Sequence, residues 1–261
     1  RKLGFSVRQT MSVAQQLYEG VDIGGNDGPV GLITYMRTDS VTLSERALEE
    51  TRQVIEHRFG REYVLSAPRR YKTKSKGAQE AHEAIRPVEV NLRPEAAARF
   101  LSKDQANLYE LIWKRTVACQ MAQAILDKVG VDIEANGYIF RATGQTVKFP
   151  GFMGVYMEGQ DLGEDENQMG EKFLPKLNEG ESLDLQKLNS DQHFTKPPAR
   201  YTEASLVKKL ESEGIGRPST YAPTITTIMT RGYIEKEGKA LKPTDVGEVV
   251  TYAAHVINKG D

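Results

Sequence analysis

The chain has 261 residues and a formal net charge of -1, so it is long enough to bury a hydrophobic core without disulfides or metals. Its single cysteine excludes an intrachain disulfide, and no apolar run reaches the roughly 20 residues that a membrane span needs. The near-neutral charge excludes a uniformly basic surface, so a polyanion would contact selected faces. Because the chain starts at Arg1 without an initiator Met and its last helical pattern runs directly into residues 259–261, we expect both ends to be cut from a longer polypeptide.

Two helices and an extended segment are predicted at the start of the chain. Residues 6–20 fit a short amphipathic helix with a capping box at its start and a glycine as its stop. Residues 31–37 are β-branched and aromatic, which is typical of a strand or an extended segment. A second capping box at Thr42 predicts a helix that continues to Gly60.

The next stretch is also predicted to be helical. Residues 81–86 are interpreted as a short helix that ends at Pro87, because proline cannot continue a helix from within. Further helices are expected over 94–100 and 106–125. The chain is therefore predicted to begin with a mostly helical domain that extends over residues 1–125.

After these helices the period of the apolar residues changes to that of strands. Apolar residues alternate with polar ones over 129–133 and recur in short groups between Gly and Pro turns as far as 155–157. We expect antiparallel strands, an exposed acidic loop over 161–171 and a domain boundary at residues 197–198. Residues 126–198 are thus predicted to be an antiparallel β domain.

The last part of the chain has the element order of a winged helix. A first helix stops at Gly214, and a second helix is expected with Pro223 in its first turn. Two short strands around Gly238 and a helix from Asp245 follow. We therefore predict a winged-helix-like part over 199–261 and, for the whole chain, an α+β multidomain fold.

Tyr35 and Arg37 are the first candidates for chemistry. Side chains alternate in an extended segment, so Ile33, Tyr35, Arg37 and Asp39 are expected to share one face. A free tyrosine has a pKa of about 10 and is a poor nucleophile at neutral pH, so Arg37 is a candidate source of positive charge for a phenolate and a phosphate. The alternative is that Tyr35 is a half-buried strand aromatic and Arg37 a surface charge, because tyrosine is frequent in strands.

The helical domain contains two further basic regions, one around His82 and Arg86 and the other over residues 69–76. His82 is a candidate donor of a proton or hydrogen bond at neutral pH, although a lone histidine is by default a surface or core residue. Arg86, four residues later, would share its helical face. Residues 69–76 form a basic run without acids, which could contact phosphates or be an ordinary solvated loop.

The turn after Gly214 and several aromatic residues are further candidates. The turn would offer backbone N–H groups at a helix start to a phosphate, with Arg217 nearby, and the alternative is an ordinary interhelical turn. Tyr201 and Tyr221 could stack on bases, and Tyr221 is the better candidate. Trp113 is expected to pack in the core of its apolar helix.

Three segments of the chain resemble motifs of the type IA DNA topoisomerases, in the order of that family. They are residues 31–40, 81–87 and 214–222, with the sequences GLITYMRTDS, AHEAIRP and GIGRPSTYA. The resemblance covers essentially the whole chain. Met36 and the form of residues 217–219 resemble topoisomerase I more than topoisomerase III.

The resemblance implies a DNA strand-passage enzyme in which Tyr35 is the nucleophile. Tyr35 would attack a phosphorus of single-stranded DNA, giving a 5′-phosphotyrosyl link and a free 3′-hydroxyl, and resealing would need no ATP. Arg37 would stabilise the scissile phosphate, and His82 would lie beside the DNA phosphates. The motifs also imply DNA-contacting roles for Arg86, Arg217, Ser219, Thr220 and Tyr221.

The resemblance also implies parts that these residues do not contain. The family has an N-terminal acidic domain that supplies a glutamate and the carboxylates for Mg²⁺, so no metal ligand is assigned to this chain. The intact enzyme would be a monomer associated with the nucleoid in the cytoplasm, relaxing negative supercoils by acting on single-stranded and underwound duplex DNA. We expect the chain alone to bind single-stranded DNA weakly and not to relax supercoils. A non-enzymatic helix-turn-helix DNA-binding protein is the alternative, but it leaves the first two motifs unexplained.

Overall fold

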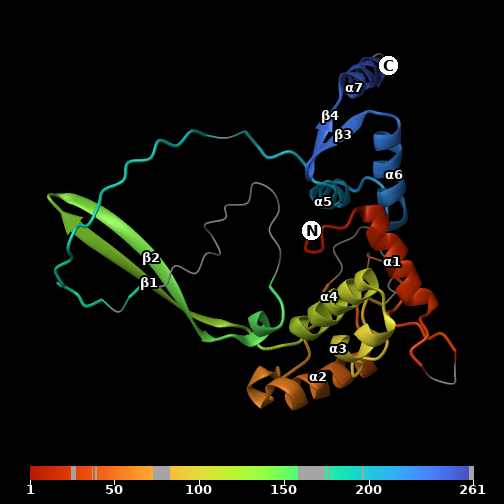
Figure 1. Cartoon of the computed structure of the whole chain (residues 1–261), viewed down its shortest axis with the longest axis horizontal. Coiled ribbons are helices and arrows are strands. Elements are labelled where there is room, and N and C mark those ends of the chain that lie inside the picture. The colour runs from red at the N-terminus through yellow and green to blue at the C-terminus, as the bar shows by residue number, and fades with distance from the viewer. Residues whose placement is uncertain are drawn as a thin grey trace. The chain divides into compact units, whose positions relative to one another are not determined.

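Figure 1 shows a computed structural model of the chain, which divides into two compact units that we describe separately. The structure describes residues 1–24, 28–36, 38, 40–72, 83–157, 174–175, 177–195 and 197–258. The first unit comprises Arg1–Ala122, Phe152–Leu162 and Arg200–Asp261, and the second comprises Gln123–Gly151 and Gly163–Ala199. The division into three domains at residues 125 and 198 stays a prediction.

Local sequence signals place the first helix. α1, Val7–Glu19, begins where the Ser6 hydroxyl accepts a hydrogen bond from the Gln9 N–H. Leu17 lies on its inner face and is fully buried. The helix predicted over 6–20 is confirmed, because its cap and its apolar stripe both arise from nearby residues.

The second helix begins later than predicted. α2, Glu45–Phe59, is capped by Ser44, whose hydroxyl accepts a hydrogen bond from the Ala47 N–H. Thr42, the predicted cap, lies before the helix, and its carbonyl accepts a hydrogen bond from the Ala84 N–H at 2.8 Å. A contact with a distant segment therefore engages the backbone of Thr42, and the cap moves to the next hydroxyl residue.

The long helix of this unit has different bounds from those predicted over 106–125. α4, Lys103–Cys119, begins earlier because Ser102 forms a capping box at its start. It ends earlier because Met121 pairs with Val64 in an isolated β-bridge, which requires an extended backbone. The shorter helical elements of the chain are η1 (Arg61–Tyr63), α3 (Pro94–Ala97), η2 (Ala98–Phe100) and η3 (Gly151–Gly154). α3 and η2 together match the helix expected over 94–100.

Two clusters of buried side chains form the core of the helical part. The first cluster contains Val13, Ala14, Leu17, Leu32, Ile33, Ala97, Leu108 and Tyr109. The second cluster contains Val54, Ile55, Val90, Trp113, Val117 and Met121. α4 contributes to both clusters. The segment that leads to Tyr35 begins inside the first cluster, so the core itself fixes its start.

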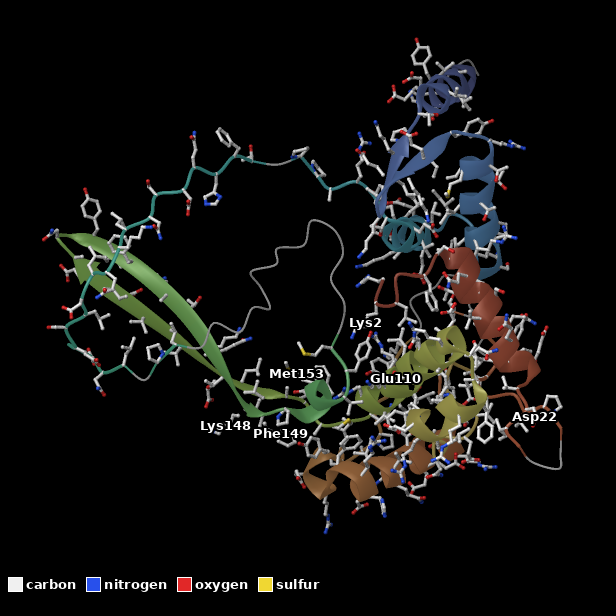
Figure 2. All side chains as sticks on the ribbon, viewed as in Figure 1. Lys2, Asp22, Glu110, Lys148, Phe149 and Met153 are labelled. Carbon is white, nitrogen blue, oxygen red and sulfur yellow. The ribbon has the colours of Figure 1, made fainter. Side chains whose placement is uncertain are left out.

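The second unit is built on one long β-hairpin. β1, Ile125–Ala135, pairs antiparallel with β2, Tyr138–Phe149, which confirms the predicted strand pairing. Asn136 and Gly137 form the turn with φ angles of 50° and 81°, as a tight two-residue hairpin turn requires. Most side chains of the hairpin are exposed, as Figure 2 shows.

The strand expected over 155–157 is absent. These residues form no strand, and a 3₁₀ turn precedes them. Phe152 and Val155 pack against the second core cluster, and the Phe152 N–H donates to the Ala122 carbonyl at 3.0 Å. Their apolar side chains therefore belong to the core of the helical part, and the spacing that indicated a strand was misinterpreted.

The last part of the first unit has the predicted order of helix, turn, helix, hairpin and helix. Its elements are α5 (Glu203–Glu213), α6 (Pro218–Thr230), β3 (Ile234–Glu237), β4 (Ala240–Pro243) and α7 (Asp245–Asn258). One detail of the prediction is wrong, because Pro223 lies inside α6 and not in its first turn. Pro218 takes the first helical position, where a missing N–H costs least.

Gly247 permits a close approach in this part of the chain. A Cβ at Gly247 would lie 2.1 Å from the Tyr233 carbonyl oxygen, which also accepts a hydrogen bond from the Thr244 N–H. We expect Gly247→Ala to destabilise the fold by about 1–3 kcal/mol through overpacking, which exceeds the gain of about 1 kcal/mol in helix propensity. Urea unfolding measures this, with Gly130→Ala as a control, since nothing lies within 4 Å of its Cβ. An unchanged midpoint for Gly247→Ala would contradict the expectation.

The described elements are helices and small antiparallel sheets, which confirms the predicted α+β class. Within the described part of the chain, we find no helix with the length and apolar character needed to cross a membrane.

Candidate active site

The extended segment that follows Gly31 is held from two sides. On one side, the Leu32 N–H donates to the Leu17 carbonyl of α1 at 2.8 Å, and on the other the Val88 N–H donates to the Leu32 carbonyl at 2.9 Å. Gly31 is required for this approach, because a Cβ there would lie 2.7 Å from the Tyr18 carbonyl oxygen. The backbone of the first motif is therefore fixed before the candidate nucleophile is reached.

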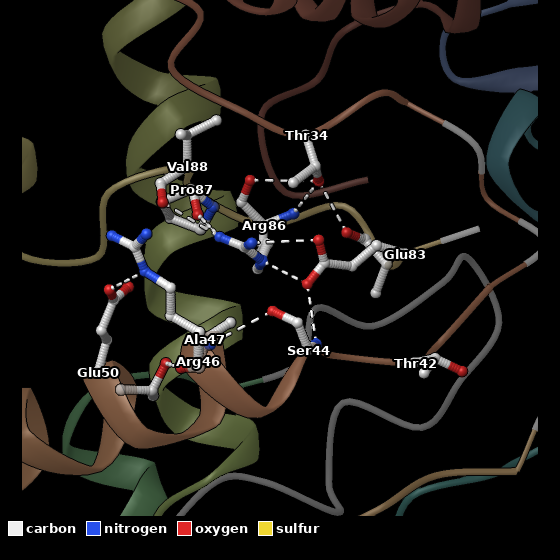
Figure 3. A network of polar contacts seen from close by, with 12 residues as sticks. Thr34, Thr42, Ser44, Arg46, Ala47, Glu50, Glu83, Arg86, Pro87 and Val88 are labelled. Atoms are coloured by element: carbon white, nitrogen blue, oxygen red, sulfur yellow. Dashed lines mark hydrogen bonds and ion pairs between the residues drawn. The ribbon is translucent and has the colours of Figure 1, made fainter. Parts of the chain in front are cut away.

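Thr34 joins the first motif to the second. Its N–H donates to the Arg86 carbonyl at 2.9 Å, and its hydroxyl donates to the Ala84 carbonyl at 2.7 Å. The same hydroxyl accepts a hydrogen bond from the Arg86 N–H at 3.0 Å. An isolated β-bridge between Ile33 and Pro87 extends the pairing. The two motifs thus meet in the structure, as Figure 3 shows around Thr34.

Tyr35 reaches the surface from this anchored segment. Its relative exposure is 50%, whereas Ile33, predicted to share its face, is 1% exposed. The predicted shared face therefore begins in the core at Ile33 and reaches the surface at Tyr35. The Tyr35 ring meets the Tyr18 ring of α1 edge to face, with the centroids 5.1 Å apart and the planes at 60°. The ring is supported on one side while half of the residue remains accessible to a large substrate.

Arg37, Asp39 and His82 lie outside the described residues. The roles predicted for Arg37 and His82 therefore stay predictions. Their described neighbours Thr34 and Ala84 are in direct contact, so the two motifs that carry Arg37 and His82 do come together.

Arg86 has a different setting from the predicted one. Residues 83–88 form an extended segment and no helix, because their backbone pairs with the first motif. The guanidinium forms a salt bridge with Glu83 and also donates to the carbonyls of Pro87 and Val88 (Figure 3). Sequence reasoning missed Glu83, and opposite charges three residues apart were the available signal. The DNA contact predicted for Arg86 stays a prediction.

Glu83 lies between Arg86 and the start of α2. Its carboxylate accepts hydrogen bonds from the Arg86 side chain and, at 2.9 Å, from the Ser44 N–H. Partial burial alone would raise the pKa of Glu83, but these hydrogen bonds outweigh it and hold the pKa below its ordinary value. A carboxyl with a lowered folded-state pKa stabilises the fold above its ordinary pKa and loses that contribution as the pH falls through the folded value. The network is therefore charged at neutral pH.

The third motif forms the start of α6. The Arg217 N–H donates to the Thr220 hydroxyl at 2.8 Å, and the Thr220 N–H donates to the Arg217 carbonyl at 2.8 Å. Arg217, Ser219 and Thr220 are all exposed. Their accessibility is compatible with the phosphate contacts predicted for them, which stay predictions.

The structure corrects one aromatic prediction and confirms another. Tyr221, the predicted base-stacking residue of the third motif, is only 8% exposed, so its ring offers no open face to a base. Tyr201 is 46% exposed, which reverses the preference between the two. Trp113 is 2% exposed and packs in the second core cluster, as predicted.

Arg69 and Arg70, which open the basic run, have partners inside the chain. The Arg69 guanidinium donates to the carbonyl of Cys119, the last residue of α4, at 3.3 Å and to that of Met121, which follows the helix, at 3.4 Å. Arg70 forms a salt bridge with Glu45 at 2.7 Å. These two residues therefore help to tie their loop to α4 and α2, in addition to adding positive charge.

A cavity of about 740 Å³ opens beside the first two motifs. Arg69, Arg115, Tyr71 and Tyr156 contribute to its lining, which contains no carboxylate among the described residues. The Tyr156 ring lies under two cations, with the Arg115 guanidinium at 5.0 Å and the Lys2 ammonium (Figure 2) at 4.3 Å from its centroid. The walls also include Thr38, Ser40, Ala84 and Ile85. The described lining thus combines two arginines and aromatic rings with apolar side chains such as Val41 and Leu43.

The described residues do not fit a metal site. Mg²⁺ takes oxygen ligands, chiefly carboxylates. Within the described ranges, no group of three or more His, Cys, Asp or Glu side chains could hold a metal ion. No step of the chemistry is therefore assigned to a metal bound by this chain.

Comparison with known proteins gives consistent results. The sequence model of the family described as DNA topoisomerase matches residues 1–259. DNA topoisomerase 1 of Xylella fastidiosa (strain Temecula1) is 52% identical over 252 residues, which cover 96% of this chain and 31% of that protein. DNA topoisomerase 1 of Rickettsia bellii is 52% identical over 253 residues, with the same coverage of 96% and 31%.

A solved structure is also similar. Full-length topoisomerase I from Thermotoga maritima has a TM-score of 0.81 and 42% identity, covering 99% of this chain and 40% of that chain. The chain thus spans 31% of the length of the curated relatives above. Since the family match extends over almost the entire sequence, the chain belongs to the DNA topoisomerase family, in the bacterial topoisomerase I group of type IA.

Proposed function

We propose that this chain carries the nucleophile of a type IA topoisomerase I, and that Tyr35 is this nucleophile. The observation that carries the proposal is the setting of Tyr35, which is 50% exposed directly after a segment hydrogen-bonded on both sides. An anchored backbone limits the positions of the phenol, and its exposure lets DNA approach. The match of the first motif to the family supports the same assignment.

In the proposed reaction, the Tyr35 hydroxyl oxygen attacks a phosphorus of single-stranded DNA. The bond between phosphorus and the phenolic oxygen forms while the bond to the 3′ oxygen breaks. The phenol loses its proton, and the departing 3′ oxygen takes up a proton to become a free hydroxyl. Because the new ester retains the energy of the phosphodiester, attack by the 3′-hydroxyl reverses the step without ATP.

Two residues, one from the first motif and one from the second, are proposed to act on the phosphate. Arg37 would stabilise its charge, since a planar guanidinium matches two phosphate oxygens better than an ammonium does. His82 would donate a hydrogen bond or a proton beside it. Arg217, Ser219 and Thr220 would contact DNA at a second place, where the start of α6 favours negative charge.

The cavity supports a path for a single strand through this region. Its two arginines, Arg69 and Arg115, offer positive charge, while Tyr71 and Tyr156 offer aromatic surface. Single-stranded nucleic acids bind to surfaces that combine these two features, because bases stack on rings and phosphates pair with cations. Its walls include residues from both motifs around Tyr35, so a strand in the cavity would pass close to the proposed nucleophile.

The activity of the intact protein is also part of the proposal. We infer that it relaxes negatively supercoiled DNA, acting as a monomer at the nucleoid in the cytoplasm on single-stranded and underwound duplex regions. Carboxylates outside this chain would hold Mg²⁺, and the bound ion would supply positive charge for the DNA phosphates. The chain alone would therefore bind single-stranded DNA weakly and leave supercoiled plasmid unrelaxed, and relaxation by the chain alone would contradict this.

The decisive experiment uses the full-length protein and a single-stranded oligonucleotide labelled at either end. After denaturation during turnover, a 3′-end label should stay attached to the protein, whereas a 5′-end label should leave on a fragment with a free 3′-hydroxyl. Peptide mapping should place the adduct on Tyr35. An adduct that retains the 5′-end label, or one on another residue, contradicts the proposal. Duplex binding without any adduct would instead favour the helix-turn-helix alternative.

A further inference from the structure

We propose that Glu83 and Arg86 are positioning residues, whose ion pair acts through the backbone of Thr34 on the placement of Tyr35. The inference rests on the proposed function, since it takes Tyr35 to be the residue that attacks DNA. It gives Arg86 a role inside the protein in place of a contact with DNA. Figure 3 shows the contacts on which it depends.

The guanidinium of Arg86 is already engaged. It donates two hydrogen bonds to the two carboxylate oxygens of Glu83, at 2.8 and 3.1 Å, and two more to the carbonyls of Pro87 and Val88, at 2.7 and 3.1 Å. Its side chain is 12% exposed. Since a guanidinium has five N–H donors, two-point binding of a phosphate would require Arg86 to release some of these partners.

Glu83 is in turn fixed by the start of α2. Its carboxylate accepts the Ser44 N–H at 2.9 Å, and the N–H of the next residue, Ala84, donates to the Thr42 carbonyl at 2.8 Å. Ser44 is the cap of α2, so the carboxylate lies at the helix N-terminus, where negative charge is favoured. A bidentate, charge-assisted pair then transmits this fixed position to Arg86.

Arg86 passes its position on to the nucleophile through its own backbone. Its carbonyl accepts the Thr34 N–H, and its N–H donates to the Thr34 hydroxyl. Thr34 directly precedes Tyr35 in the chain. Loss of the ion pair would therefore loosen the residue that holds Thr34 and allow the phenol to move. A displacement of about 1 Å at a reacting group can lower a rate by about 100-fold.

The test compares Glu83→Gln, Arg86→Met and the double variant in the full-length protein. Each single variant should slow adduct formation by about 10- to 100-fold, and the double variant should be no slower than the worse single one, because both remove the same interaction. The Kd for single-stranded DNA and its salt dependence should not change. Glu50→Gln is the matched control, since it breaks the neighbouring ion pair with Arg46, whose side chain is 81% exposed.

A DNA contact by Arg86 predicts a different result. Arg86→Met would then raise the Kd and reduce the slope of log K against log salt by about 0.7, while Glu83→Gln would keep the normal rate. That result overturns the proposal. So does a slowing in Glu83→Gln no larger than in Glu50→Gln.

Two further measurements separate positioning from misfolding and from failure of the proposed function. Thr34→Ser keeps the hydroxyl that contacts Ala84 and Arg86, so it should form the adduct at the normal rate. Thr34→Val lacks this hydroxyl and should form the adduct as slowly as Glu83→Gln does. Amide exchange needs no DNA: Thr34 N–H should exchange at least about 10-fold faster in Glu83→Gln. If the wild type forms no adduct, the proposed function fails, but this exchange still tests whether the ion pair holds the Thr34 backbone. An unchanged exchange rate of the Thr34 N–H in Glu83→Gln overturns the positioning role.

Discussion

Tyr35→Phe should abolish the covalent protein–DNA adduct and the relaxation activity of the full-length protein. Phenylalanine keeps the ring, and with it the edge-to-face contact with Tyr18, so the segment should remain in place. Only the oxygen that would form the bond to phosphorus is removed. We expect adduct formation to fall by at least about 10⁴-fold, as when other enzymes lose a nucleophile. Denaturing gels of the 3′-end-labelled oligonucleotide measure the adduct.

Binding and a surface tyrosine provide the controls for this change. Tyr35→Phe should keep its Kd for single-stranded DNA within about tenfold, because a neutral hydrogen bond from a phenol contributes only about 0.5–1.5 kcal/mol. Tyr138→Phe, on the hairpin of the second unit and 73% exposed, should form the adduct at the normal rate. A normal amount of adduct in Tyr35→Phe would remove Tyr35 from its proposed role.

Trp113→Ala should cause the largest loss of stability in the helical part. Trp113 is 2% exposed in the second core cluster, and its indole N–H donates to the Val90 carbonyl at 2.8 Å. The substitution leaves a large cavity and a buried carbonyl without this donor. We expect the free energy of unfolding to fall by about 3–5 kcal/mol. Urea unfolding followed by far-UV circular dichroism is the suitable measurement, since the variant lacks the chain's single tryptophan.

An exposed aromatic residue is the control for the core substitution. Tyr252→Ala on α7 removes a ring that is 73% exposed, so the free energy of unfolding should change by less than about 0.5 kcal/mol. If Trp113→Ala lowered it by less than about 1 kcal/mol, the second cluster would not have the stabilising role assigned to it here.

Helix ends were predictable where their signals lie within one or two turns. The Ser6 cap of α1 and the glycine after it act on their own helix, and the structure shows both. The order of elements after residue 200 follows from the same kind of local signal. The hairpin of the second unit was predictable too, because its apolar and polar residues alternate and Asn136-Gly137 favours a tight turn.

The wrong predictions occur where a distant contact outweighs the local signal. Thr42 has the features of a cap, but its carbonyl pairs with the Ala84 N–H, and Ser44 caps α2. Residues 83–88 have no helix, because backbone pairing with the first motif satisfies their polar groups. Tyr221 was expected to be open to bases, and packing buries it.

By itself, the sequence determined the class of elements, the three motifs and the choice of Tyr35 as candidate nucleophile, because short-range spacing and residue type carry that information. Only the tertiary structure decided that Thr34 and Arg86 share backbone hydrogen bonds, and that Glu83 holds the Arg86 guanidinium. The contact between Thr34 and Arg86 joins residues 52 positions apart. Such pairings depend on how the whole chain satisfies its buried polar groups, which no local pattern specifies.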